Sequence, residues 1–278
     1  MKCFICGSDC EYFTTVDYLS GAFCSVAIQA GFSHAELFKC KHCGSVFSQL
    51  HQEMTQDALG KLMHNGHKYW EEVKQFVFSH SIDTFPIGTA PHLQEALMIN
   101  VALKNKLAAG DVLLDYASGS GHLGKILKKY FSVDVLNYEP FAQEDAIDYI
   151  PKEKLGKYPF VLNCAMFQCL NSLESFEHLC SLVSEKGALF LQTVVKGDIT
   201  VEYLKHIFYS PLCANAPSNK GMQILMERFN FVSSCYSPKA KAWIWFREDC
   251  GKDKIDALNA EFLSTEFYYK KGFVDYWK

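Results

Sequence analysis

The sequence predicts an α/β fold in which a mostly parallel sheet carries helices on both faces and ends in an antiparallel edge strand. A small cysteine-rich element precedes this sheet. Three observations support the prediction. An apolar strand ends in Asp115, a small-residue turn follows, and a helical pattern begins at His122. Strand-like and helical segments alternate over residues 110–195, which is typical of a parallel sheet. Two Cys-x2-Cys-Gly segments lie near the N-terminus.

Composition and charge narrow the class of protein. The chain has 278 residues, of which 49% are hydrophobic and 14% aromatic, enough for a substantial core. Its formal net charge of -4 argues against a broad nucleic-acid surface, which needs clustered positive charge. It has no apolar run of membrane-spanning length and no N-terminal signal region, so we expect a cytoplasmic protein. In the reducing cytoplasm, the twelve cysteines indicate metal ligands or buried small side chains rather than disulfides.

The two cysteine pairs predict a zinc-ribbon-like element over residues 1–55. The predicted ligands are Cys3, Cys6, Cys40 and Cys43. In a Cys-x2-Cys turn the backbone amides point at the thiolate sulfurs, and the following glycine tolerates the required φ. Four thiolates leave no open coordination position, so we predict a structural Zn²⁺ site. We expect Cys10, Cys24 and His42 to be bystanders.

Residues 56–109 are predicted to form a helical linker or lid. Apolar residues recur at helical spacing from Leu59 to Val77, and again from His92 to Leu107. Pro86 and Pro91 interrupt the helical pattern between these two segments.

Residues 110–250 are predicted to form one Rossmann-like domain, and residues 251–278 add a helix and an aromatic tail. The predicted strands are Val112–Asp115, Val133–Tyr138, Phe160–Cys164, Ala188–Val194, Phe231–Tyr236 and Ala242–Arg247. The predicted helices span residues 122–131, 172–184 and 219–229. We expect Gly187 to end the second of these helices.

The turn after the first strand of this domain is the candidate ligand site. Asp115 ends the strand, and the carboxyl ends of parallel strands face the ligand crevice. Gly119 and Gly121 have no Cβ, so the backbone can approach a ligand closely. Glu139 ends the next strand, where an acidic group can accept hydrogen bonds from ribose hydroxyls. The nicotinamide fingerprint places its first glycine directly after the strand, whereas here Asp115 precedes the turn. This pattern fits a turn that holds S-adenosylmethionine.

The sequence resembles class I S-adenosylmethionine-dependent methyltransferases over roughly residues 95–247. The resemblance is carried by Leu113–His122, Tyr138–Pro140, Phe160–Leu170 and Pro217–Phe231. The arrangement of a four-cysteine element before such a domain is similar to that of bacterial methyltransferases of sugar and secondary-metabolite pathways.

The resemblance also implies roles for individual residues. The implied cofactor contacts are Asp115, Ala117, Gly119 and Gly121 at the methionine portion, Glu139 at the ribose, and Asn163 in the fourth-strand motif. Ala117 replaces the family's first glycine, and Gln168-Cys169 stands where the family often has Glu-His. The third strand is expected to be short, over Ala146–Ile150.

Methyl transfer requires a positioned acceptor and, for many acceptors, removal of its proton. His206 and Tyr209 follow the fifth strand on an irregular segment, where a substrate would cross the cleft. We therefore predict His206, and after it Tyr209, as the catalytic residues.

The function that we predict is methyl transfer from S-adenosylmethionine to an oxygen or carbon of a small molecule, such as a sugar or a natural-product intermediate. Two alternatives stay open. One is an RNA methyltransferase whose zinc element binds RNA. The acidic pI disfavours this alternative. The other is a binding protein that keeps the fold and has lost activity, which Ala117 and the shortened middle of the sheet favour. We expect no membrane partner, and the sequence does not decide the oligomeric state.

Overall fold

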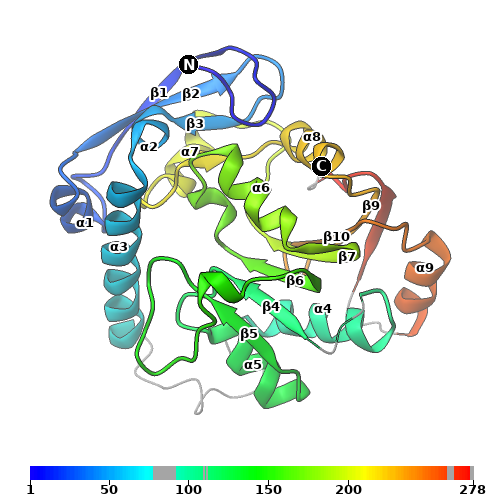
Figure 1. Ribbon diagram of the computed structural model, residues 1–278. Coiled ribbons are helices and arrows are strands. Elements are labelled where there is room, and N and C mark those ends of the chain that lie inside the picture. Colours follow the sequence, from blue (N-terminus) through cyan, green and yellow to red (C-terminus); the bar gives the residue numbers. More distant parts are fainter. Residues whose placement is uncertain (78–91, 109, 111, 262–265, 276–278) are drawn as a thin grey trace.

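The computed structural model describes residues 1–77, 92–108, 110, 112–261 and 266–275 (Figure 1). The predicted breaks at Pro86 and Pro91 lie outside these residues. The helices are α1 (Cys24–Gln29), α2 (Gln49–Glu53), α3 (Gln56–Val77), α4 (Leu93–Lys104), α5 (His122–Phe131), α6 (Leu173–Ser181), α7 (Val201–Ile207), α8 (Asn219–Arg228) and α9 (Lys252–Glu261). In this part of the chain, no helix has the length and apolar character needed to cross a membrane.

The larger sheet has seven strands in the order β11-β9-β10-β7-β6-β4-β5. These strands are β4 (Leu113–Tyr116), β5 (Val135–Tyr138), β6 (Tyr158–Cys164), β7 (Val183–Gln192), β9 (Ser233–Ser237), β10 (Ala242–Phe246) and β11 (Tyr268–Lys271). Strands β5, β4, β6 and β7 pair in parallel, and β10, β9 and β11 continue the sheet with antiparallel pairs. The predicted α/β class is confirmed, and the antiparallel edge is extended because the aromatic tail adds β11.

Both faces of this sheet are covered, as the continuous apolar runs of its central strands predict. Leu113 of β4 packs with helices α4 and α5, whereas its neighbour Leu114 packs on the opposite face with α6 and α8. The same alternation runs through Phe160 and Val161 of β6. Figure 1 shows α4 and α5 on one side of the sheet and α6 and α8 on the other. This layering leaves the carboxyl ends of β4, β5 and β6 at one edge.

Two local predictions differ from the structure. The expected strand at Ala146–Ile150 is reduced to one parallel bridge between Asn137 and Tyr149. Gly187 does not end a helix: α6 stops at Ser181, and Gly187 lies inside β7. An added Cβ at Gly187 would come within 2.9 Å of the Pro159 carbonyl oxygen, so close strand packing explains this glycine.

The N-terminal residues form a second sheet of four strands, with the order β1-β2-β3-β8. Its strands are β1 (Cys10–Asp17), β2 (His34–Cys40), β3 (Val46–Ser48) and β8 (Asn215–Ala216). Strand β8 comes from the segment between α7 and α8, so the second sheet is completed by residues far along the chain. The N-terminal sheet therefore shares a strand with the segment between α7 and α8 and is not an independent domain.

Candidate functional site

The turn between β4 and α5 depends on left-handed backbone. Ala117, Gly119 and Gly121 have φ angles of 58°, 51° and 63°. An added Cβ on Gly119 would lie 2.9 Å from Nε2 of His67 on α3, so a side chain at this position would have to displace the His67 ring. Ala117 adopts the conformation of the glycine that it replaces, and the turn is therefore preserved at a conformational cost.

Replacing Ala117 with glycine should raise the free energy of unfolding by about 1 kcal/mol. The left-handed conformation costs an L-residue about 1–2 kcal/mol, and the greater conformational entropy of glycine in the unfolded chain offsets part of the gain. Urea denaturation measures the change. Ala30 is the matched control, because it is exposed and has a φ of -82°. Its replacement by glycine should lower stability, and an A117G protein less stable than the wild type would contradict the prediction.

Two acidic side chains flank the turn. The Glu139 carboxylate accepts hydrogen bonds from the backbone N–H groups of Gly119 (2.8 Å), Phe141 (2.9 Å) and Ala142 (3.1 Å). Asp115 is buried, with 1% of its surface exposed, and burial together with the nearby Glu139 charge raises its pKa to about 8. Within the described residues, Oδ1 of Asp115 has no hydrogen-bond partner. The pair forms an acidic site that would favour a positively charged donor.

Two asparagines present further acceptors at this edge of the sheet. Asn137 is the register partner of Asp115 on β5, and Asn163 is the last residue but one of the neighbouring strand β6. Nδ2 of Asn163 donates to the Tyr116 carbonyl oxygen at 3.1 Å, which fixes the amide. Among the described residues, Oδ1 of each asparagine is buried without a hydrogen-bond partner. The sequence prediction included Asn163 and missed Asn137, because only the register of β4 and β5 brings Asn137 beside Asp115.

Helix α3 lies against the turn. Oγ of Ser120 donates to Glu71 at 3.2 Å, and Nε2 of His67 lies 3.9 Å from the same carboxylate. From the far side, the Tyr149 hydroxyl donates to the Gly119 carbonyl oxygen at 2.6 Å. Figure 1 shows α3 running beside the segment that follows β5. The helical region that was predicted as a linker or lid thus contacts the glycine turn directly.

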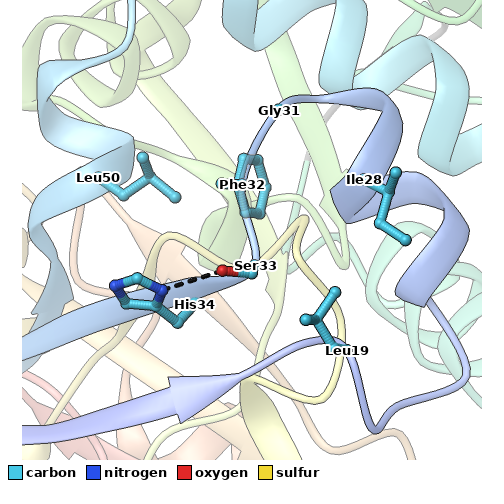
Figure 2. Close-up of a pocket in the computed structure, with 7 residues that line it drawn as sticks. All are labelled: Leu19, Ile28, Gly31, Phe32, Ser33, His34 and Leu50. Carbon is cyan, nitrogen blue, oxygen red and sulfur yellow. Dashed lines mark hydrogen bonds between the residues drawn. The ribbon is translucent and has the colours of Figure 1, made fainter.

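Two hollows lie outside this acidic site. One of about 360 Å³ is bounded by α3 and by Pro140 and Phe141, next to Glu139 in the chain. The other, of about 500 Å³, lies in the N-terminal region and is lined by apolar side chains such as Ile28 and Leu50 (Figure 2). Ser33 and His34 line it as well and are hydrogen-bonded to each other at 3.1 Å. Neither hollow is lined by Asp115.

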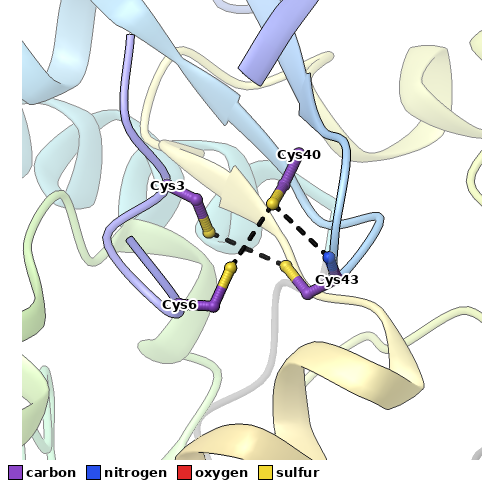
Figure 3. A group of neighbouring side chains, drawn as sticks. All are labelled: Cys3, Cys6, Cys40 and Cys43. Carbon is purple, nitrogen blue, oxygen red and sulfur yellow. Dashed lines mark hydrogen bonds between the residues drawn. The ribbon is translucent and has the colours of Figure 1, made fainter. Parts of the chain in front are cut away.

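The predicted zinc ligands come together at a second site (Figure 3). The sulfur atoms of Cys3, Cys6, Cys40 and Cys43 lie within 4.8 Å of one another. The Cys3–Cys43 and Cys6–Cys40 sulfur distances are 3.7 and 3.5 Å. A tetrahedral zinc ion with Zn–S bonds of about 2.3 Å separates its sulfurs by about 3.8 Å, so the donor set fits Zn²⁺.

The backbone around these cysteines has the predicted knuckle form. Gly7 and Gly44 have φ angles of 76° and 77°, and each amide donates to the carbonyl oxygen of the first cysteine of its pair. The Cys43 amide donates to the Cys40 sulfur at 3.4 Å. The hydrogen bond between Cys3 and Cys43 raises the pKa of Cys3 and lowers that of Cys43, as expected of a thiol paired with a thiolate.

This cysteine site is anchored to the larger domain. Oγ of Ser218, the N-cap of α8, donates to the Cys43 carbonyl oxygen at 2.5 Å, and the Ser218 amide donates to Oγ of Ser45 at 3.1 Å. Three of the cysteines are buried in the same apolar cluster as Met222 of α8 and Leu189 of β7. The four-cysteine site is therefore placed to join the N-terminal sheet to the larger domain.

No protein-family model and no curated protein matches the sequence. The solved structures that match include several methyltransferases. The plantazolicin methyltransferase BpumL in complex with SAH has 10% identity and a TM-score of 0.44, with 69% of this chain and 99% of that chain covered. An O-methyltransferase family protein from Burkholderia thailandensis has 12% identity and a TM-score of 0.44, with 72% and 75% covered. Human N-acetylserotonin methyltransferase in complex with SAM has 12% identity and a TM-score of 0.41, with 70% and 57% covered. Because these identities and TM-scores are low, we base the function on the residues of this chain.

His206 and Tyr209 lie elsewhere than the acidic turn. His206 is exposed in the last turn of α7, and the buried face of α7 packs through Leu204 against Leu37 of the N-terminal sheet. The Tyr209 ring is 46% exposed, and its centroid lies 5.9 Å from that of Phe23. The structure thus places both residues beside the N-terminal sheet, and their catalytic role stays a prediction.

Proposed function

We propose that this chain binds S-adenosylmethionine at the β4–α5 turn and transfers its methyl group to an oxygen or carbon of a small molecule. The observation that carries the proposal is the buried Asp115, whose Oδ1 has no partner among the described residues. A buried carboxylate needs a donor or a positive charge to balance the cost of burial. The cofactor carries an ammonium and a sulfonium, whereas a pyrophosphate would be repelled by Asp115 and Glu139.

Each predicted cofactor contact has a role in this proposal. Asp115 accepts hydrogen bonds from the ammonium of the methionine portion, and Glu139 accepts them from ribose hydroxyls. Glu139 already holds the turn through backbone N–H groups, and an ionised carboxylate has about four acceptor sites, so capacity for the ribose is left. Ala117, Gly119 and Gly121 let the backbone approach the ligand, and Asn163 offers a further acceptor.

When bound, the cofactor supplies an electrophilic methyl group on a positively charged sulfur. The chain positions the acceptor in line with that methyl group and takes its proton. His206 remains our proposed proton acceptor, and Tyr209 remains our second proposed catalytic residue. The contacts of α3 with the turn support its role as a lid that excludes water from the cofactor.

We further propose Zn²⁺ for the four-cysteine site, with a structural role, because four thiolates close the coordination shell. The proposed division of the chain is a zinc element at 1–55, a lid at 56–109, a methyltransferase domain at 110–250 and a C-terminal addition at 251–278. No observation favours the RNA alternative. The left-handed Ala117 keeps the turn intact, which removes one of the two reasons to propose an inactive protein; the other, the short third-strand region, stays.

Thermal unfolding with added ligands tests the proposal. S-adenosylhomocysteine at about 100 times its Kd should stabilise the folded state by about 2.7 kcal/mol, which for a chain of this size raises the Tm by about 5 °C. NAD and ATP at the same concentrations serve as controls and should leave the Tm unchanged. A Tm that rises with NAD or ATP but not with S-adenosylhomocysteine would refute the proposed cofactor.

A further inference from the structure

A second group of metal-ligating side chains lies at the carboxyl end of β6. His92 and Glu95 lie at the start of α4, and Cys164 is the last residue of β6. One ligand atom from each lies within 4.8 Å of the other two. The N-cap position of His92 and the first-turn position of Glu95 place both side chains at the N-terminal face of α4. The β6 strand then brings the cysteine from a distant part of the sequence to that face.

The geometry distinguishes a metal shell from a catalytic relay. Nδ1 of His92 lies 3.5 Å from the Cys164 sulfur and 3.9 Å from Oε1 of Glu95. In a nucleophile–histidine–acid relay, the nucleophile and the acid contact opposite ring nitrogens. Here both groups approach the same nitrogen. Three donors that converge on one point are the arrangement that a metal ion requires.

We infer that His92, Glu95 and Cys164 bind a second divalent metal ion of the zinc type, distinct from the four-cysteine site. Bonds of about 2.3 Å to sulfur and about 2.0 Å to nitrogen in a tetrahedral shell predict a sulfur–nitrogen distance of about 3.5 Å, which the structure matches. A thiolate and a carboxylate together neutralise the ion. The nitrogen, oxygen and sulfur set suits zinc rather than magnesium or calcium, which prefer all-oxygen shells.

The surroundings give this site an open side. The Glu95 side chain is 16% exposed and the His92 side chain 31% exposed, so the donors are sheltered but reachable. The Asp115 carboxylate acts electrostatically on Cys164 from the same edge of the sheet, and Lys241 faces Glu95 with an opposing positive charge. Zinc sites with three protein ligands keep a fourth position for water or a substrate.

That fourth position would bind the acceptor, and this part of the inference rests on the proposed function. A hydroxyl or thiol ligated to zinc loses its proton near neutral pH, which makes it a nucleophile. Its proton leaves through solvent to the proton acceptor proposed above, its lone pair forms the bond to the methyl carbon, and the methyl–sulfur bond breaks with its electron pair kept by sulfur. The acceptor class is then a hydroxyl or thiol compound that ligates a divalent metal.

Cobalt titration of the untagged full chain, stripped of metal, tests the site. The wild type should bind two equivalents of Co²⁺, counted by the visible absorption of the thiolate-bound ion and by elemental analysis. Glu95→Gln and Cys164→Ser should each bind one equivalent. Cys24→Ser is the matched control, because Cys24 lies outside both clusters, and it should bind two.

The one equivalent of Co²⁺ that each variant still binds at the four-cysteine site shows that the variant is folded. If Cys164→Ser fails to fold, Glu95→Gln still tests the inference. One equivalent in the wild type, or two equivalents in both variants, would overturn the inference. Binding of S-adenosylhomocysteine, measured on the same samples, separates the two proposals. One metal equivalent with intact cofactor binding rejects only the second metal site, whereas two equivalents without cofactor binding reject only the proposed function.

Discussion

Replacing Cys40 with serine should destabilise the chain by on the order of 5 kcal/mol, because loss of a structural zinc site removes binding energy that the folded state depends on. Cys40 is one of the four clustered cysteines, and its sulfur lies 3.5 Å from the Cys6 sulfur and 3.4 Å from the Cys43 amide nitrogen. Urea denaturation measures the loss. Hydrogen exchange should show that strands β1, β2 and β3 lose protection before the larger sheet does.

Cys10→Ser is the matched control for this prediction. Cys10 is partly buried and is the register partner of Cys40, yet it is not a member of the four-sulfur group. Its replacement should cost less than about 1 kcal/mol, and a chelator should destabilise this variant as much as the wild type. Equal unfolding midpoints for the Cys40 and Cys10 variants would show that no metal holds the N-terminal sheet.

Asp115→Asn should stabilise the free protein at pH 8 and weaken cofactor binding at least 100-fold. Burial raises the pKa of Asp115 to about 8 from its ordinary value of 3.8, so the folded state binds this proton more tightly than the unfolded chain does. The contribution of this bound proton to the free energy of unfolding is fully present below pH 3.8 and is lost as the pH rises towards 8. An asparagine removes the buried charge, which should gain on the order of 5 kcal/mol at pH 8.

Urea denaturation of the wild type and the variant at pH 5 and pH 8 measures this difference, which should be larger at pH 8. Asp134→Asn is the control, because Asp134 is exposed and paired with Lys128 on the surface. Its effect on cofactor affinity should be negligible. An Asp115→Asn protein that is less stable than the wild type at pH 8 would contradict the cost assigned to the buried carboxylate.

The sequence predicts those parts of the molecule that depend on neighbouring residues. The strand, turn and helix from Leu113 to Phe131 follow from local hydrophobic and glycine patterns. The two cysteine turns follow from Cys-x2-Cys-Gly spacing, and the four sulfurs lie together as predicted.

The remaining features depend on long-range pairing, which local patterns do not contain. Strand β8 joins the N-terminal sheet from residue 215, and β11 extends the larger sheet from the aromatic tail. Asn137 reaches the acidic turn only through the register of β4 and β5. His92 and Cys164 meet although 72 residues separate them, so no sequence motif marks their pairing. Packing between α4 and the end of β6 creates that group.

Isothermal titration calorimetry with S-adenosylhomocysteine tests the central claim most directly. It is run at about pH 7.5 on the zinc-loaded wild type and on Asp115→Asn. We expect one binding site per chain in the wild type, with proton release from Asp115 that makes the measured heat depend on the ionisation enthalpy of the buffer. The variant should bind at least about 100-fold more weakly, without that buffer dependence. No binding to the wild type, or equal affinity for both proteins, would contradict the assignment of the Asp115 turn as the cofactor site.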